Sequence, residues 1–503
     1  MAIDSKRIAK NTVFLYARLL LVLGVTLYTS RVVLDKLGVD DYGLYNVVFG
    51  VIGLLSFLNG TLSFGTSRFI TFELGKKDMG RLKATFRTAL GAHAFLAGLI
   101  ILLGETVGIW YVYHVMVCPP ERFGAALIVY QFSILSTVLS ILQVPFSSAV
   151  LAHEKMDFYA YLGVFEAVGK LVVAFLLFKT PFDRLVYYAA LMALVSVGTF
   201  AICAFYCKAK FEEVSFKIAI ERSIFFSILK FSGWNIIANI SNTLMSQGVI
   251  MLFNIFFQPF VVAAQAISNQ ISSALMQFVN NVRQAVNPQV IKLYAEGNYA
   301  DSKRLTLSSA EYIFDLLLLF GVPLIMAMPA ILDIWLVEVP QYTVEFARLI
   351  VVQDILGNFS AAFYTPMVAA NKIEKNSIAA LFLCVIQFSA LYILFKIGLS
   401  PLWARYVGIL FVIIWSFVVK PYILWKDIDY SWKEMWTCIG RCMRVLVLVV
   451  ALCSVMYLLL PQTSLGRSVL VAFLSFTIVG AVSFAFMEKS IKYRLINYIR
   501  SRV

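Results

Sequence analysis

The amino-acid sequence predicts an all-α, polytopic membrane protein. Hydrophobic residues make up 61% of its 503 residues and charged residues only 14%, whereas soluble globular chains carry about 25% charged residues. The apolar residues gather in segments of about 20 residues or more, which is long enough for a helix to cross a bilayer. Short hydrophilic loops separate these segments, and positive charge concentrates on alternate loops. A bundle of membrane helices accounts for all three observations.

Fourteen segments qualify as predicted membrane spans. In chain order they are residues 12–34, 42–67, 85–113, 123–152, 158–178, 184–207, 229–257, 259–286, 306–336, 342–370, 373–396, 402–425, 438–460 and 466–487. The first is too long for the apolar part of a signal peptide, and no clear small-residue cleavage site follows it. It is therefore predicted to be a retained span.

The distribution of basic residues predicts the orientation. Of the 42 Lys and Arg, 31 are assigned to loops on one side and 8 to loops on the other, while Arg18, Arg31 and Lys170 fall inside spans. Because Lys and Arg are retained in the cytoplasm during insertion, both termini are predicted to be cytoplasmic. Retention and contacts with anionic membrane lipids also explain the net charge of +14, so no nucleic-acid partner is predicted.

An internal repeat predicts the domain organisation. The loop from Glu73 to Leu82 and the loop from Ala295 to Leu305 share a Glu followed by Asp-x-x-Arg-Leu at an offset of about 223 residues. Two six-helix lobes in the same orientation, bracketing a central cavity, are typical of many transporters. The predicted parts are an N-terminal lobe (1–207), a cytoplasmic linker (208–228), a C-terminal lobe (229–425), and two further helices with a basic tail (426–503).

Ionisable residues inside spans are the first candidate site residues. Each costs at least about 2.5–3.5 kcal/mol at the centre of a span, so it usually faces a partner or a wet interior. Arg18 is assigned to a cavity, whereas Arg31 also fits an ion pair with Asp35 near the end of its span. Glu166 and Lys170 are four residues apart, which permits either a structural pair or a coupling relay. Asp315 and Asp354 lie nearer span ends and are further candidates for ion coupling, with a structural role as the alternative.

Amide residues form stripes along three spans. Asn59 lies in the second span among serines and threonines. The stripes of the seventh and eighth spans contain Asn235, Asn239 and Asn242, and Asn269, Gln277, Asn280 and Gln284. Hydrogen bonds between helices explain one or two such residues, but stripes of this length favour a water-filled cavity. Amides suit sugar hydroxyls, and arginines suit phosphates.

The sequence lacks a constellation for catalysis. Its histidines, His93, His114 and His153, lie in three separate regions, and no phosphate-binding glycine-rich loop or metal-ligand cluster is present. We therefore predict a protein that is not an enzyme and has no cofactor, with coupling to H⁺ or Na⁺ left open. A membrane-bound polysaccharide polymerase or acyltransferase is the alternative from another class.

Three motifs resemble a known transporter family. The stretch Tyr28–Asn46, which includes Arg31, Gly38 and Gly43, resembles the end of helix 1 and the start of helix 2 in the polysaccharide-transporter (O-antigen flippase) branch of the multidrug/oligosaccharidyl-lipid/polysaccharide (MOP) flippase superfamily. Thr66–Lys77 and Asn287–Gln289 resemble the segments that follow helices 2 and 8. The resemblance implies a MATE-like fold in a bacterial inner membrane.

The resemblance also implies a function and a site. Such flippases move an undecaprenyl-pyrophosphate-linked oligosaccharide by alternating access during surface polysaccharide and O-antigen biosynthesis, in contact with the polysaccharide assembly machinery. Matching positions to the family's cationic cavity points to Arg18, Arg31, Arg68 and Arg283, although Arg68 and Arg283 also fit simple cytoplasmic retention. A lipid II flippase and a MATE-type drug/cation antiporter are the alternatives, but the acidic residue that drug exporters often carry in helix 1 is missing before Asp35.

Overall fold

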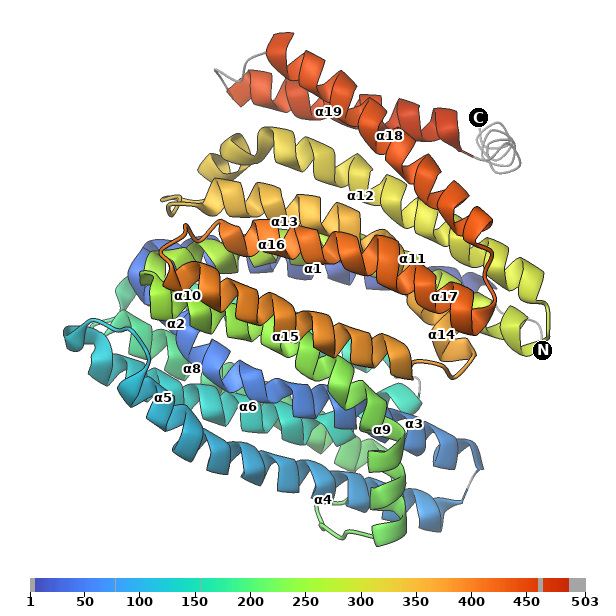
Figure 1. Ribbon diagram of the computed structural model, residues 1–503. Helices are drawn as coiled ribbons and strands as arrows, with labels where there is room; N and C mark the ends of the chain where they lie inside the picture. Colours follow the sequence, from blue (N-terminus) through green and yellow to red (C-terminus); the bar gives the residue numbers. More distant parts are fainter. Residues whose placement is uncertain (1–4, 77, 154, 460–464, 488–503) are drawn as a thin grey trace. The chain divides into compact units, whose positions relative to one another are not determined.

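The computed structural model describes residues 5–76, 78–153, 155–459 and 465–487, and every regular element in these ranges is helical (Figure 1). The predicted all-α fold is therefore confirmed. Ten of the described helical segments are long and apolar enough to cross a membrane. The chain is a multi-pass membrane protein.

Each predicted span coincides with one helix or with two consecutive helices. The helices are α1 (Ser5–Leu37), α2 (Val39–Gly53), α3 (Phe57–Lys76), α4 (Met79–Leu103), α5 (Ile109–His114), α6 (Phe123–Ala152), α7 (Met156–Leu176), α8 (Arg184–Lys210), α9 (Arg222–Thr243), α10 (Val249–Phe256), α11 (Pro259–Ala295), α12 (Tyr299–Trp335), α13 (Thr343–Asn358), α14 (Tyr364–Ala369), α15 (Glu374–Lys396), α16 (Trp403–Ile413), α17 (Lys420–Ile428), α18 (Trp432–Leu459) and α19 (Leu465–Phe486). The ten apolar segments leave out α1, α2 with α3, α9 with α10, and α11. These are the helices that carry the predicted polar stripes and the arginines of the first span.

Irregular turns divide several spans into two helices. Single π-helical turns at Gly104–Gly108, Leu244–Gly248 and Ile414–Val419 separate α4 from α5, α9 from α10 and α16 from α17. Such turns leave carbonyl groups without their usual helical partner, and other groups then satisfy them. The hydroxyl of Tyr130, for example, donates to the carbonyl of Gly104 at 2.6 Å.

The helices form two compact units. Unit 1 comprises Met1–Ala266, Trp335–Pro340 and Ala380–Pro401, and unit 2 comprises Ile267–Ile334, Gln341–Ala379 and Leu402–Val503. Unit 1 therefore includes α9, α10, the start of α11 and most of α15 in addition to the first eight helices. This division reflects packing alone and does not test the internal repeat, so the two six-helix lobes stay a prediction.

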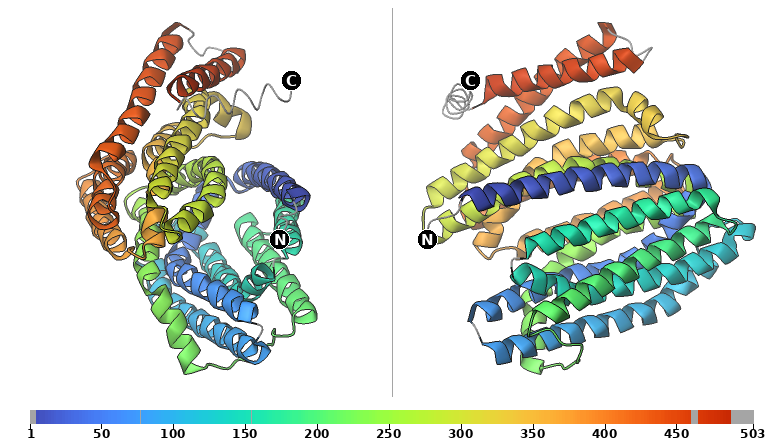
Figure 2. Two further views of the ribbon diagram at one scale, coloured as in Figure 1. Left: turned by 90° about the vertical axis from the view of Figure 1, so that its right-hand side faces the viewer. Right: turned by 180° about the vertical axis from the view of Figure 1, so that it is seen from behind.

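Unit 1 is built around α6, which packs against α3, α4 and α8 (Figure 2). Its core includes Phe86 and Phe146, whose rings pack edge to face with centroids 5.5 Å apart. The predicted linker joins this core, because Phe211 and Val214 are buried against α6 and α8. The linker is thus anchored on unit 1 by apolar burial.

In unit 2, α13 packs against α16, α14 packs against α17, and α18 packs against α19. Unit 2 also contains most of α11, all but the last residue of α12, and the irregular 3₁₀ turn Phe359–Phe363 between α13 and α14. Most of the buried polar contacts described below lie in this unit.

Candidate functional site

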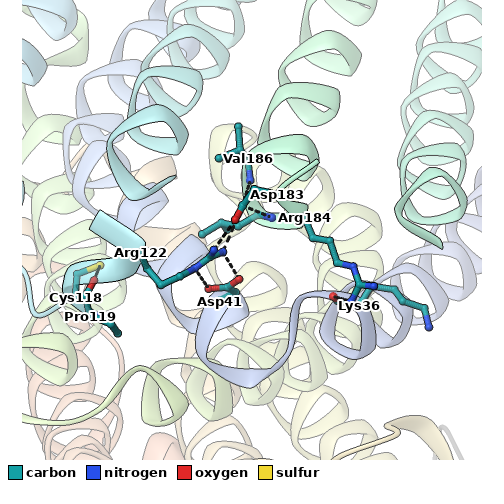
Figure 3. Close-up of polar contacts among 9 residues, drawn as sticks. Lys36, Asp41, Cys118, Pro119, Arg122, Asp183, Arg184 and Val186 are labelled. Carbon is teal, nitrogen blue, oxygen red and sulfur yellow. Dashed lines mark hydrogen bonds and ion pairs between the residues drawn. The ribbon is translucent and has the colours of Figure 1, made fainter. Parts of the chain in front are cut away.

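A charged network joins the helix ends of unit 1 near the start of α6 (Figure 3). Arg122 donates from Nε to Asp41 Oδ1 at 2.8 Å, and its terminal nitrogens pair with both Asp41 and Asp183. Asp183 also accepts from the backbone N–H groups of Leu185 and Val186, so it caps the N-terminus of α8. Arg122 therefore holds the starts of α2, α6 and α8 together, a role that the sequence did not reveal.

The pKa values of the two carboxyl groups in this network shift in opposite directions. Burial raises the pKa of Asp41, and the nearby Arg122 offsets only part of the rise. Burial alone would raise the pKa of Asp183 as well. The charge of Arg122 and the hydrogen bonds from the capping N–H groups outweigh this effect, so the pKa of Asp183 lies below its ordinary value. Asp183 therefore stabilises the fold above the pKa of an unfolded aspartate, about 3.9, and loses this contribution as the pH falls. The pKa of Asp41 is shifted upward instead, so the contributions of Asp41 and Asp183 to the pH dependence of stability partly cancel.

Replacing Arg122 by glutamine is expected to lower the free energy of unfolding by about 2 kcal/mol, because two carboxylates lose a charged donor. Thermal unfolding of the detergent-purified protein measures the effect. Lys396→Gln is the matched control, since Lys396 is an exposed basic residue at the end of α15 in the same unit. A loss for Arg122→Gln no larger than that of the control would show that the network does not stabilise the fold.

A polar cluster lies inside unit 2, where α11 meets α13 and α16. The hydroxyl of Ser272 donates to Asp354 Oδ2 at 2.6 Å, and Asn358 donates to Asp354 Oδ1 at 3.3 Å. Arg405 donates to Asn269 Oδ1 at 3.4 Å and to the side-chain oxygen of Gln353 at 3.3 Å. These bonds place the guanidinium of Arg405 in the same cluster as Asp354, because Gln353 directly precedes Asp354 and Asn269 lies one helical turn before Ser272. A membrane-embedded carboxylate with a buried counter-charge is thus available for coupling to a cation or a proton.

This cluster brings together two predicted site residues, Asn269 and Asp354, with one that the sequence reasoning missed. Arg405 is only 8% exposed and lies in the helical segment Trp403–Ile428, although the sequence analysis does not name it among the charges inside spans. The same holds for Lys420 and Arg441, which are 8% and 7% exposed. All three fall inside predicted spans, and this position was the signal that could have singled them out.

Asp315 forms an ion pair between α12 and α18. Arg441 donates from Nη2 to Asp315 Oδ2 at 2.6 Å, and its Nε lies 3.5 Å from Glu311 Oε2. Arg441 also donates to the backbone carbonyl of Phe486 at the end of α19. These contacts link three helices of unit 2. They support the structural role that was the alternative to ion coupling for Asp315.

Glu166 and Lys170 form the ion pair that their spacing predicts. Lys170 Nζ lies 2.6 Å from Glu166 Oε1 on α7, and both side chains are substantially exposed. An exposed pair of this spacing contributes only about 0.3–0.5 kcal/mol in water. The geometry supports the pair itself, and the coupling relay stays a prediction.

The other predicted site residues are dispersed over α1, α3, α9 and α11. Arg31, Asn59, Asn239 and Arg283 are half-buried, whereas Arg68, Asn242, Gln277 and Asn280 are exposed. The guanidinium of Arg68 lies over the ring of Phe69, with 5.8 Å to its centroid. Arg18, Asn235 and Gln284 are in helices, but their side chains lie outside the described residues.

Cysteines placed at Gln277 and Asn280 are expected to react rapidly with a membrane-impermeant maleimide, because both side chains are exposed on α11 and a thiol reacts in water as its thiolate. Labelling is followed in membrane vesicles, in a background where half-exposed Cys118 is serine. Val279→Cys is the control, since Val279 is 1% exposed on the same helix. Equal protection of all three positions would instead support hydrogen bonding between helices.

An apolar pocket of about 340 Å³ lies in unit 2 between α11, α12 and α19. Phe278, Phe320 and Phe476 contribute aromatic rings to its lining, and Pro323 in the interior of α12 forms part of the wall. The lining suits hydrocarbon, and it includes residues of α19, one of the two helices predicted to lie outside the repeat.

No protein-family model and no curated protein sequence matches the chain. Solved structures do match. A lipid II flippase MurJ in an inward closed conformation aligns with a TM-score of 0.68 at 12% identity, over 95% of this chain and 99% of its own. An inward-facing multidrug resistance MATE family transporter of the MOP superfamily aligns with a TM-score of 0.67 at 16% identity, over 79% of this chain and 93% of its own. A MOP superfamily transporter from Pyrococcus furiosus aligns with a TM-score of 0.58 at 15% identity, over 83% of this chain and 96% of its own.

These likenesses define the class of the fold. The chain is a helical membrane protein with the fold shared by MATE transporters and the lipid II flippase, and the solved structures named above are transporters. The predicted MATE-like fold is confirmed. At 12–16% identity the likeness concerns the fold alone.

Proposed function

We propose that the protein is a flippase that moves an undecaprenyl-pyrophosphate-linked oligosaccharide across a bacterial cytoplasmic membrane, by alternating access, for surface polysaccharide and O-antigen biosynthesis. The extent of the structural match carries this proposal. Alignment with the lipid II flippase over 95% of the chain leaves about 25 residues unmatched, fewer than the 28 residues of α18 alone. The match therefore extends into the last two helices, whereas the multidrug transporter leaves about a fifth of the chain unmatched.

The apolar pocket favours a substrate with a hydrocarbon chain. Helix α19 contributes Ala472 and Phe476 to this pocket, so one of the two helices predicted to lie outside the twelve-helix repeat builds an apolar surface. A lipid-linked substrate has a long hydrocarbon chain, which can pack against an apolar lining through dispersion contacts. A small cationic drug has no comparable part.

The polar residues suit the other end of such a substrate. Arg18, Arg31, Arg68 and Arg283 supply positive charge for a pyrophosphate, because guanidinium groups bind phosphate oxygens through paired hydrogen bonds. The amides of α3, α9 and α11 supply donors and acceptors for sugar hydroxyls. The protein acts without catalysis or a cofactor in this proposal, with both termini in the cytoplasm and the polysaccharide assembly machinery as partner.

Asp354 is the proposed coupling residue. It lies in a segment apolar enough to cross the membrane, and it combines a hydroxyl donor from Ser272 with the nearby charge of Arg405. Asp315 is paired directly with Arg441, and Glu166 is paired with Lys170. Asp354 is therefore better placed to exchange a proton or a cation during transport.

The proposal is tested in a strain from which the gene is deleted. Lipid-linked oligosaccharide is expected to accumulate in the membrane fraction while surface polysaccharide is lost, as measured by mass spectrometry of extracted lipids and by immunoblotting. Accumulation of lipid II would assign the protein to peptidoglycan precursors, and increased drug sensitivity with normal polysaccharide would assign it to drug export. Normal surface polysaccharide with no accumulated precursor would disprove the proposed function.

A further inference from the structure

The loop that follows α12 packs with a different unit from the helices that it joins. Residues Trp335–Pro340 belong to unit 1, whereas α12 up to Ile334 and the chain from Gln341 into α13 belong to unit 2. Leu336 is 3% exposed, so this loop is docked by apolar burial. We call Trp335–Pro340 the strap. Because both of its ends continue into unit 2, any movement of one unit against the other pulls on the strap.

A hydrogen bond ties the strap to α1. The indole N–H of Trp335 donates to the backbone carbonyl of Leu27 at 2.7 Å. This carbonyl lies inside α1, where it also accepts from the hydroxyl of Ser30 at 3.0 Å. A tryptophan side chain has one donor and no acceptor, and the half-buried Trp335 uses that donor on α1. Phenylalanine at this position would keep most of the ring but would lose the bond.

A proline and an arginine shape the end of α12 that leads to the strap. Pro329 lies inside α12 and has no N–H, so the carbonyl of Ile325, four residues earlier, loses its helical donor. The Nε group of Arg348 on α13 donates to this carbonyl at 3.0 Å instead. Proline positions are where long helices bend, so Arg348 braces α12 just before the strap.

The other end of the strap leads into backbone strain. Tyr342 precedes α13 with a φ of 70°, in the left-handed region that bulky side chains rarely adopt. Such a conformation persists only where the surrounding structure holds it, and it is typical of segments that switch. The strap therefore lies between a proline bend and a strained tyrosine, and a relaxed loop would need neither.

We propose that Trp335 is a latch, which holds the strap on α1 while the outer side of the protein is closed and releases it when the protein opens outward. With both termini in the cytoplasm, as predicted, α1 and α12 both run outward, so the strap is at the outer side. Alternating access moves one half of a transporter against the other, and a strap docked on one unit but continuous with the other must then detach. A neutral hydrogen bond suits this role, because its net contribution is small enough to be broken in every cycle.

This inference rests on the proposed flippase function, because alternating access supplies the movement that the latch controls. The residues of the latch lie apart from the proposed substrate and coupling residues. Release of the strap can therefore be measured without any substrate.

The first test measures release in the full-length protein purified in detergent, in a background where Cys118 is serine. Leu336→Cys places a buried thiol on the strap, and its rate of reaction with a maleimide reports detachment. Trp335→Phe is expected to raise this rate about fivefold, the population change that loss of one hydrogen bond produces. Trp403→Phe is the control, since Trp403 is an exposed tryptophan at the start of α16, and its rate is expected to stay within twofold. An equally small change in Trp335→Phe would overturn the latch.

The second test keeps Trp335 and locks the strap, so it decides the question even if Trp335→Phe fails to fold. Tyr28→Cys and Val337→Cys place exposed thiols within two residues of the bonded groups. A bis-methanethiosulfonate reagent with a flexible spacer is expected to link them through disulfides and to stop transport of lipid-linked oligosaccharide in proteoliposomes. Reduction is expected to restore transport, and the two single-cysteine variants treated in the same way are the controls. Failure of the thiols to link, or full transport in the linked protein, would overturn the latch.

The two tests separate the latch from the proposed function. Faster labelling in Trp335→Phe, with normal surface polysaccharide in the deletion strain, rejects the flippase function and leaves the latch in place. Polysaccharide lost in that strain, with unchanged labelling and full transport in the linked protein, rejects the latch alone.

Discussion

Replacing Asp354 by asparagine is expected to reduce gradient-driven transport at least tenfold while the protein still inserts and folds. The asparagine side chain keeps the shape of the carboxylate and still accepts the hydroxyl of Ser272, which donates at 2.6 Å in the natural protein. It cannot exchange a proton or balance the charge of a cation. A tenfold loss corresponds to about 1.4 kcal/mol of transition-state free energy, well within the cost of one uncompensated charge inside a membrane protein.

The measurement follows the exposure of lipid-linked oligosaccharide to an added lectin in proteoliposomes, with and without an imposed H⁺ or Na⁺ gradient. Asp333→Asn is the control, since Asp333 is an exposed acid of α12. The double variant Asp354→Asn/Arg405→Gln removes both charges, so it tests whether a stranded Arg405 causes the loss. We expect the double variant to stay insensitive to the gradient. Recovery of gradient-driven transport in the double variant, or a normal gradient response in Asp354→Asn, would remove Asp354 from the coupling mechanism.

Replacing Arg441 by alanine is expected to cost about 3–5 kcal/mol of stability, because it leaves the buried carboxyl group of Asp315 without its cation and removes the cation beside the half-buried Glu311. Arg441 contacts Asp315 at 2.6 Å and also donates to the carbonyl of Phe486, so α18 and α19 lose a link to α12. Thermal unfolding in detergent measures the loss. Arg444→Ala is the control, since Arg444 lies one turn further along α18 and is exposed.

A double-mutant cycle separates the pair from its surroundings. Asp315→Leu together with Arg441→Met replaces both charges by apolar groups of similar size, and we expect most of the lost stability to return. Additive losses in the double variant would show that Arg441 acts through other contacts.

The fold could be predicted from the sequence because the bilayer restricts what a long apolar segment can do. Such a segment must satisfy its own backbone hydrogen bonds, and a helix does so alone. The fourteen predicted segments therefore coincide with helices. The π-helical turn at Ile414–Val419 was not predicted, since hydropathy does not report local hydrogen-bond register.

The buried cations were missed for a different physical reason. A count of charges by loop assigns a residue near a span end to the water outside, and Arg405, Lys420 and Arg441 all lie within a few residues of one. Which face of the helix each occupies depends on partners far away in the sequence, such as Asn269, Ser360 and Asp315. The amide stripe of α11 was seen, but the sequence could not tell that Asn269 faces Arg405 while Gln277 is exposed.

The interleaved units have a consequence for expressing the protein in pieces. The chain passes from one unit to the other after Ala266, Ile334, Pro340, Ala379 and Pro401, so no single cut yields two fragments that each contain a whole unit. A gene split within the predicted linker would separate α3 from α9, which pack together in unit 1. Each of the two fragments would leave its half of the α3–α9 contact unpaired until the fragments met in the membrane. We therefore expect that the two fragments must be co-expressed for either one to accumulate.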